Sequence, residues 1–151
     1  MLININPILN PELLYHMRAM GHGDKLVLTD ANFPASSHAL NNKVIRLDGV
    51  NIYEATKAIL SVFPLDSFID SAASRMQVDN KPDELTECHK DFINAVRESA
   101  GENWKVGSIE RQDFYREAKN SYLIVSTSET RPYGCFISVS YTHLRAHETP
   151  A

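Results

Sequence analysis

Hydrophobic positions along the chain form two kinds of pattern. Short apolar runs, typical of buried strands, lie at residues 25–30, 44–47, 104–109, 122–125 and 134–139. The ambiguous stretch 68–78 is expected to hold another strand in its later part. Apolar residues at helical spacing predict helices after residue 10, across 52–63, from residue 80 and across 114–119. Because the strands alternate with helices, the pattern predicts an α/β fold with a mostly parallel sheet in a single domain.

Several of these helices carry recognisable end signals. Asn10 and Pro11 combine a capping side chain with a proline at the first helical position, and Gly21 is suited to the C-terminal cap of the same helix. Pro64 is expected to stop the second helix. Residues 80–83 are expected to open the clearest helix, and one face of it is expected to carry Leu85, Cys88, Phe92 and Val96.

Size and charge narrow the class of partner. The chain has 151 residues, which suits one domain with its own core, and a formal net charge of −4 with both signs interspersed. This balance gives no basic surface for nucleic acid or an anionic membrane, so a small neutral ligand is expected. The first residues lack a signal-peptide pattern, and no apolar run approaches a membrane span. With only two cysteines and no disulfide framework, these features predict a soluble, cytoplasmic protein.

The clearest candidate for proton transfer is His22, in the segment Gly21-His22-Gly23-Asp24. Flanking glycines allow unusual backbone conformations and the close approach of a ligand, and an imidazole gives and takes protons near neutral pH. The alternative is a helix-capping glycine followed by a surface histidine without a role.

Five further residues have both a chemical and a structural interpretation. Asp30 closes an apolar strand, where it either faces a cavity or caps the next loop through an Asx turn, and Asp66 has the same two interpretations. Arg111 either donates to sugar hydroxyls or forms a solvated ion pair. Tyr115 and Tyr133 are either core or rim aromatics, or phenols that donate to a hydroxyl and stack on a sugar ring.

Other chemistries find no support in the sequence. It contains no glycine-rich phosphate loop and no nucleophile elbow, so no nucleotide cofactor is expected. His143 and His147 are four residues apart, but two ligands without a third do not make a metal site, and none is predicted.

Taken in order, several segments resemble the ribose pyranase / fucose mutarotase family, and its fucose branch more closely. The matching segments are Pro11-Glu-Leu-Leu14, Met20-Gly-His-Gly-Asp24, Thr29-Asp-Ala-Asn-Phe-Pro34, Val44-Ile-Arg-Leu-Asp-Gly49, Leu65-Asp-Ser67, Arg111 with Phe114-Tyr115, and Arg131-Pro-Tyr-Gly134. Each is short, but their order and spacing extend the resemblance from about residue 1 to about residue 137.

The resemblance implies a three-layer α/β fold and an isomerase that interconverts the α and β anomers of a monosaccharide without a metal or organic cofactor. It also implies a ring-like homo-oligomer, expected to be a decamer, with active sites near subunit boundaries. L-fucose is the favoured substrate, because the ribose branch usually has a histidine where this chain has Arg111. D-ribose pyranase activity and a non-catalytic monosaccharide-binding subunit are the alternatives.

Site residues carry over from the family by position. The catalytic set is His22, which matches the proton donor, together with Asp66 and Tyr115. The substrate-binding set is Asp30, Arg111, Tyr133, Gly134 and Cys135. Which of Tyr115, Asp66 and Tyr133 supplies the second proton function is left open.

Two features depart from the family. Cys135 replaces the usual asparagine and so removes an amide that both donates and accepts hydrogen bonds. The mutarotase domain is expected to span residues 1–137, followed by an atypical tail, 138–151, that lacks the family's short basic ending.

Overall fold

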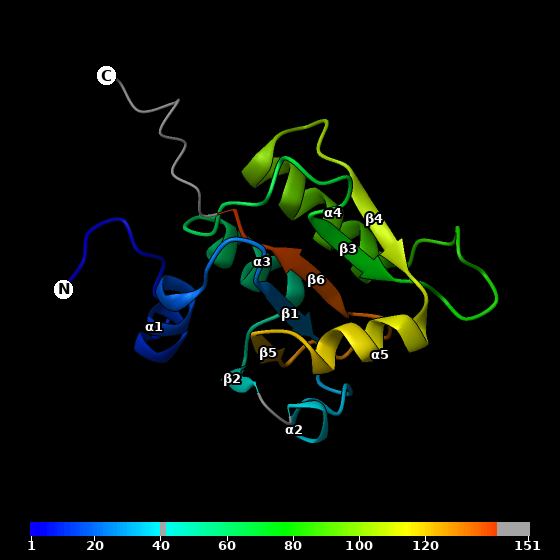
Figure 1. Ribbon diagram of the computed structural model, residues 1–151, viewed down its shortest axis with the longest axis horizontal. Coiled ribbons are helices and arrows are strands. Elements are labelled where there is room, and N and C mark those ends of the chain that lie inside the picture. Colours follow the sequence, from blue (N-terminus) through cyan, green and yellow to red (C-terminus); the bar gives the residue numbers. More distant parts are fainter. Residues whose placement is uncertain (40–41, 142–151) are drawn as a thin grey trace.

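A twisted sheet forms the middle layer of the protein (Figure 1). The computed structural model describes residues 1–39 and 42–141. In this part of the chain the strands are β1 (Lys25–Thr29), β2 (Lys43–Leu47), β3 (Ala73–Met76), β4 (Val106–Ile109), β5 (Leu123–Thr127) and β6 (Phe136–Val139). Their order across the sheet is β2-β5-β1-β6-β3-β4. Neighbouring strands are parallel except at β6, which is antiparallel to both β1 and β3.

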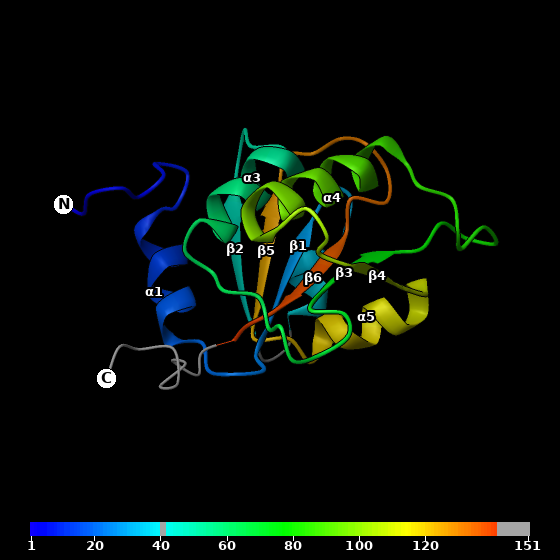
Figure 2. The same ribbon diagram turned by 90° about the horizontal axis from the view of Figure 1, so that it is seen from above.

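Helices cover both faces of this sheet. The helices are α1 (Pro11–Ala19), α2 (Ala35–His38), α3 (Ile52–Leu60), α4 (Glu87–Ala100) and α5 (Arg111–Lys119). In Figure 2, α3 and α4 lie above the sheet and α5 lies below it. The expected three-layer α/β fold with a mostly parallel sheet is therefore confirmed.

Each face of the sheet has its own apolar core, which explains why the strands are apolar on both sides. In β1, Leu26 and Leu28 belong to the cluster that packs under α1, α3 and α4, and the intervening Val27 belongs to the cluster under α2 and α5. On the first face Phe92 of α4 stacks on Phe136 of β6, with ring centroids 4.0 Å apart.

Two predicted helix boundaries are wrong. The C-cap of α1 is Met20 in an extended conformation, not Gly21, because the Met20 side chain is buried and the Asp24 carboxylate accepts the Gly21 N–H at 2.7 Å. The fourth helix begins at Glu87 rather than at residues 80–83, because Thr86 supplies a capping box. Leu85 therefore lies outside the helix and is exposed.

The remaining helix signals behave as expected. Asn10 caps α1 by accepting the Leu13 N–H at 2.8 Å. Helix α3 ends at Leu60, four residues before Pro64. On α4, Cys88, Phe92 and Val96 are buried on one face.

Strand β6 connects the two edges of the sheet. It begins where the parallel strands end and returns to the edge where they begin. There the Ser140 carbonyl accepts the Gly23 N–H at 2.9 Å, and the Val139 carbonyl accepts the Asp66 N–H at 3.0 Å. The domain boundary at residue 137 stays a prediction; His143, His147 and the rest of 142–151 lie outside the described residues.

Candidate active site

The predicted site residues divide into two groups at opposite edges of the sheet. His22 and Asp66 precede β1 and β3, so they lie at the edge where the parallel strands begin, the amino edge. The other six lie at the carboxyl edge, where the parallel strands end: Asp30, Arg111, Tyr115, Tyr133, Gly134 and Cys135. The five residues of β1 alone separate the edges by about 16 Å, at roughly 3.3 Å per residue. One chain therefore does not bring the two groups together.

At the amino edge, His22 and Asp66 form a pair. Nε2 of His22 lies 3.9 Å from Oδ2 of Asp66, and the imidazole side chain is 40% exposed whereas the carboxylate side chain is 3% exposed. Gly23 holds the turn after the histidine with a φ of +85°, a conformation that favours glycine. Asp66 is fixed in turn, because its Oδ1 accepts the Phe68 N–H at 2.9 Å. A buried carboxylate thus lies behind an accessible imidazole.

At the carboxyl edge, Asp30 organises the loops around it. Its Oδ1 accepts the N–H groups of Asn32 and Phe33, both at 3.0 Å, and its Oδ2 accepts the Gly134 N–H at 3.0 Å. The Asx turn considered from the sequence is therefore present. Three of the roughly four lone-pair positions of a carboxylate are used by backbone donors, so Asp30 retains little capacity for other partners.

The segment Tyr133-Gly134-Cys135 follows a strained path beside Asp30. Tyr133 has a φ of +60°, which is uncommon for a residue with a side chain. A Cβ at Gly134 would lie 3.0 Å from Cβ of Asp30 and 3.1 Å from Sγ of Cys88, so only glycine fits without a shift. The Cys135 side chain is buried, 3.9 Å from Oδ2 of Asp30, and burial raises the pKa of its thiol well above the usual value.

Arg111 and Tyr115 extend this group along the first turn of α5. The guanidinium carbon of Arg111 lies 6.0 Å from the centroid of the Tyr115 ring. The same ring contacts Phe33 and His38, at centroid distances of 5.7 and 5.2 Å. The carboxyl edge therefore offers an aromatic surface with a cation beside it, a combination suited to the C–H face and hydroxyls of a sugar.

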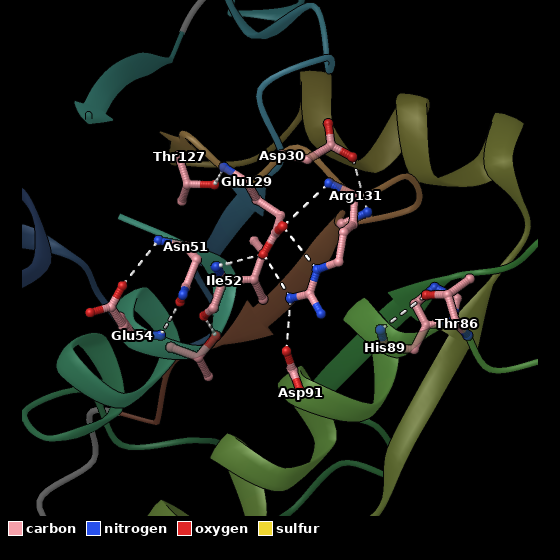
Figure 3. Close-up of polar contacts among 12 residues, drawn as sticks. Asp30, Asn51, Ile52, Glu54, Thr86, His89, Asp91, Thr127, Glu129 and Arg131 are labelled. Atoms are coloured by element: carbon pink, nitrogen blue, oxygen red, sulfur yellow. Dashed lines mark hydrogen bonds and ion pairs between the residues drawn. The ribbon is translucent and has the colours of Figure 1, made fainter. Parts of the chain in front are cut away.

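An ion pair that sequence reasoning missed supports this edge. Glu129 is buried and accepts two hydrogen bonds from the Arg131 guanidinium, at 2.9 and 3.0 Å, and one from the Ile52 N–H at 3.2 Å (Figure 3). Arg131 also donates to Asp91 of α4 at 2.7 Å. The hydrogen bonds from Arg131 lower the pKa of Glu129 to about 2. The glutamate's own carbonyl accepts the Ala31 N–H at 2.8 Å, which fixes the loop that follows Asp30.

His89 is a second buried polar residue that the sequence did not single out. It lies on α4 against the rings of Tyr133 and Phe136. Its Nδ1 accepts the Thr86 N–H at 3.2 Å, so the tautomer carries its proton on Nε2 (Figure 3). Burial, reinforced by the nearby Arg75 cation, lowers the pKa of His89 to about 4, so the ring is neutral at pH 7. The only sequence signal for it was its position three residues after a capping threonine.

Within 1–39 and 42–141, no three His, Cys, Asp or Glu side chains are arranged to hold a metal ion. Across the same residues, no helix combines the length and the apolar character needed to cross a bilayer.

Comparisons with known proteins show which proteins this chain is similar to. A family profile described as the RbsD / FucU transport protein family matches residues 3–140. A protein named fucose mutarotase from Danio rerio is 44% identical over 138 residues, 88% of each chain. One named L-fucose mutarotase from Haemophilus influenzae is 38% identical over 91% of this chain and 94% of its own. The solved structure of the Streptococcus pneumoniae fucose mutarotase in complex with L-fucose matches with a TM-score of 0.83 and 37% identity, covering 92% of this chain and 97% of that one.

The burial of neutral His89 predicts a pH-dependent stability. As the pH falls below 6.5, His89 becomes protonated in the unfolded chain, whereas in the folded protein it becomes protonated only near pH 4. The contribution of His89 to the free energy of unfolding is therefore fully present above pH 6.5 and falls as the pH drops towards 4. The loss is about 3 kcal/mol, at about 1.4 kcal/mol per pKa unit. Urea unfolding of wild type and His89→Gln at pH 8, 6, 5 and 4 measures the difference. Parallel pH profiles for the two proteins would contradict it.

Removing the charge of Glu129 is expected to destabilise the fold. Glu129→Gln leaves Arg131 with Asp91 as its one carboxylate partner among the described residues, and reduces the free energy of unfolding by about 2 kcal/mol. This loss is smaller than the usual cost of breaking a buried pair because Arg131 is partly exposed. Glu87→Gln, which removes an exposed partner of Lys90, is the matched control and changes it by less than about 0.5 kcal/mol. Denaturant titration at pH 7 compares the two, and equal losses would refute a special role for Glu129.

Proposed function

Because this chain belongs to the RbsD / FucU transport protein family, we propose that it is an L-fucose mutarotase, which interconverts the α and β anomers of the sugar. The observation that carries the proposal is the presence of two groups of polar and aromatic side chains, on a chain whose relatives are named fucose mutarotases. An accessible imidazole with a carboxylate behind it lies at one edge, and an aromatic surface with a guanidinium lies at the other. Arg111 favours L-fucose over D-ribose, since the ribose branch usually has a histidine at this position.

Mutarotation needs two proton functions. The ring oxygen gains a proton and the anomeric hydroxyl loses one, so the C1–O bond of the ring breaks and an aldehyde forms; reclosure on the other face reverses both transfers. His22 supplies one function, since its imidazole side chain is accessible and an imidazole can both give and take a proton. Asp66 orients the imidazole and stabilises its protonated form rather than acting on the sugar itself.

The carboxyl-edge group binds the sugar and supplies the other proton function. Arg111 donates to sugar hydroxyls, the Tyr115 ring packs against the sugar's C–H face, and a phenol of Tyr115 or Tyr133 exchanges the second proton. Gly134, Cys135 and Asp30, whose carboxylate retains little capacity for other partners, contribute mainly by fixing backbone groups of the site. A site with such pre-oriented donors rejects sugars whose hydroxyls leave them unpaired.

A complete site on this proposal needs two copies of the chain. His22 of one subunit meets the carboxyl-edge group of a neighbour, since about 16 Å of strand separates the two groups within one subunit. Phe68, whose exposed ring contacts the Tyr141 ring that also contacts His22, supports a contact there. Repetition of this head-to-tail contact closes a ring, and we propose that the ring-like assembly is a decamer. We also propose that the protein is cytoplasmic. Sedimentation velocity measures the assembly.

Wild-type protein is expected to accelerate the exchange of L-fucose anomers above the rate in buffer, read directly by saturation-transfer NMR. His22→Asn lowers this acceleration by about 100-fold or more, because one of the two proton functions is lost. His16→Asn on α1 is the control and retains the wild-type rate. A wild type that binds L-fucose without exchanging its anomers would make the chain a binding subunit, and full activity of folded His22→Asn would remove that residue from the mechanism.

Mixed oligomers test the shared site. His22→Asn and Arg111→Ala are each expected to be inactive, but a site that takes His22 from one variant and Arg111 from the other is intact. Random mixing in co-expressed oligomers restores about a quarter of the wild-type rate, because each site draws its two halves independently from neighbouring copies. Separately purified variants that are mixed without subunit exchange are the control. If the co-expressed oligomers stay inactive while remaining assembled, each site lies within one chain.

A further inference from the structure

We propose that Asp79 is a positioning residue that sets the orientation of Arg111 and Tyr133 for the sugar. Asp79 was not singled out from the sequence, yet it contacts both residues. Its carboxylate Oδ1 lies 3.4 Å from Nε of Arg111, and its backbone N–H donates to the Tyr133 hydroxyl at 3.2 Å. This inference rests on the proposed function, in which both partners bind the substrate.

The location of Asp79 follows from the backbone on either side of it. The Gln77 N–H donates to the Ile109 carbonyl at 2.8 Å, which aligns the chain after β3 with the chain that enters α5. The Met76 N–H donates to the Cys135 carbonyl at 3.0 Å, which aligns the same chain with the segment before β6. Asp79 follows Gln77 by two residues and therefore lies between Arg111 and Tyr133.

The segment that carries Asp79 is anchored farther along. Val78 and Lys81 form an antiparallel bridge around the turn, where Asn80 has a φ of +64°. Beyond the turn, the buried Arg75 side chain donates through Nη2 to the Pro82 carbonyl at 2.9 Å. These contacts fix the turn from both sides, so the Asp79 backbone is held in place before any substrate arrives.

The two contacts of Asp79 leave the binding groups available. The carboxylate engages Nε of Arg111, so the two terminal Nη groups, which make no hydrogen bond within residues 1–39 and 42–141, remain for a ligand. Two parallel N–H donors suit a pair of neighbouring sugar hydroxyls. At Tyr133 the Asp79 N–H occupies a lone pair of the phenol, which leaves the phenolic proton free to be donated. Asp79 thus prepares the donors without competing for them.

Asp79→Asn is the sharpest test, because it removes the charge and keeps the backbone N–H that contacts Tyr133. Both side chains of the Asp79–Arg111 pair are a little over 40% exposed, so the pair is a weak one. We expect the KM for L-fucose exchange to rise about fivefold with kcat changed less than about twofold, and the Kd from saturation-transfer titration to rise in parallel. Asp83→Asn, the same charge change at an exposed position of the same segment, leaves both constants unchanged.

A double-mutant cycle separates positioning from general structural damage. In an Arg111→Gln background, Asp79→Asn is expected to have no further effect on the Kd for L-fucose, since its action passes through the guanidinium. An additive effect in that background, an unchanged KM, or tighter binding by Asp79→Asn would each overturn the inference while leaving the proposed function in place. A wild type that neither exchanges nor binds L-fucose overturns both.

Discussion

The return of β6 between two parallel strands is the constraint on which the arrangement of the site depends. Because β6 runs against β1 and β3, its start lies at the carboxyl edge, directly after Tyr133-Gly134-Cys135. Its end lies at the amino edge, where it accepts backbone hydrogen bonds from Gly23 and Asp66. One strand of four residues therefore holds both half-sites in fixed relation and also keeps them apart. On the proposed mechanism, which needs both groups, each site requires a neighbouring copy, so the stability of the assembly and the activity would be linked.

At the carboxyl edge, polar side chains without a proposed role in proton transfer hold the surrounding loops in place. Glu129 joins the N-terminus of α3 to Arg131, and through it to Asp91 of α4, while its carbonyl holds the loop after Asp30. Such an ion pair stabilises little in net terms because its charges lose solvation, but it is costly to break. Its effect is mainly geometric, since it fixes loops from different layers around one edge.

The sequence predicted the layers, the strands and most helices, because these depend on local periodicity and capping. The wrong start for α4 shows the limit of local signals, since residues 80–83 contain a helix-like opening that loses to the capping box at Thr86. The separation of His22 from Arg111 follows from the common direction of β1 and β4, because one residue precedes its strand and the other follows its strand. Glu129, His89 and Asp79 were missed because each also has a contact that is distant in sequence. Ile52 is 77 residues from Glu129, Phe136 is 47 residues from His89, and Tyr133 is 54 residues from Asp79.

Cys135 illustrates what a departure from a family pattern means physically. An asparagine at this position adds an amide with donors and an acceptor, whereas the buried thiol is a weak donor held in its neutral form by a raised pKa. Its side chain lies near Oδ2 of Asp30, which already accepts the Gly134 N–H at 3.0 Å. The carboxylate therefore does not depend on an amide at position 135 for its main partners. The close approach of Gly134 to Asp30 does not involve the side chain at position 135, so this constraint on the backbone is present with either residue.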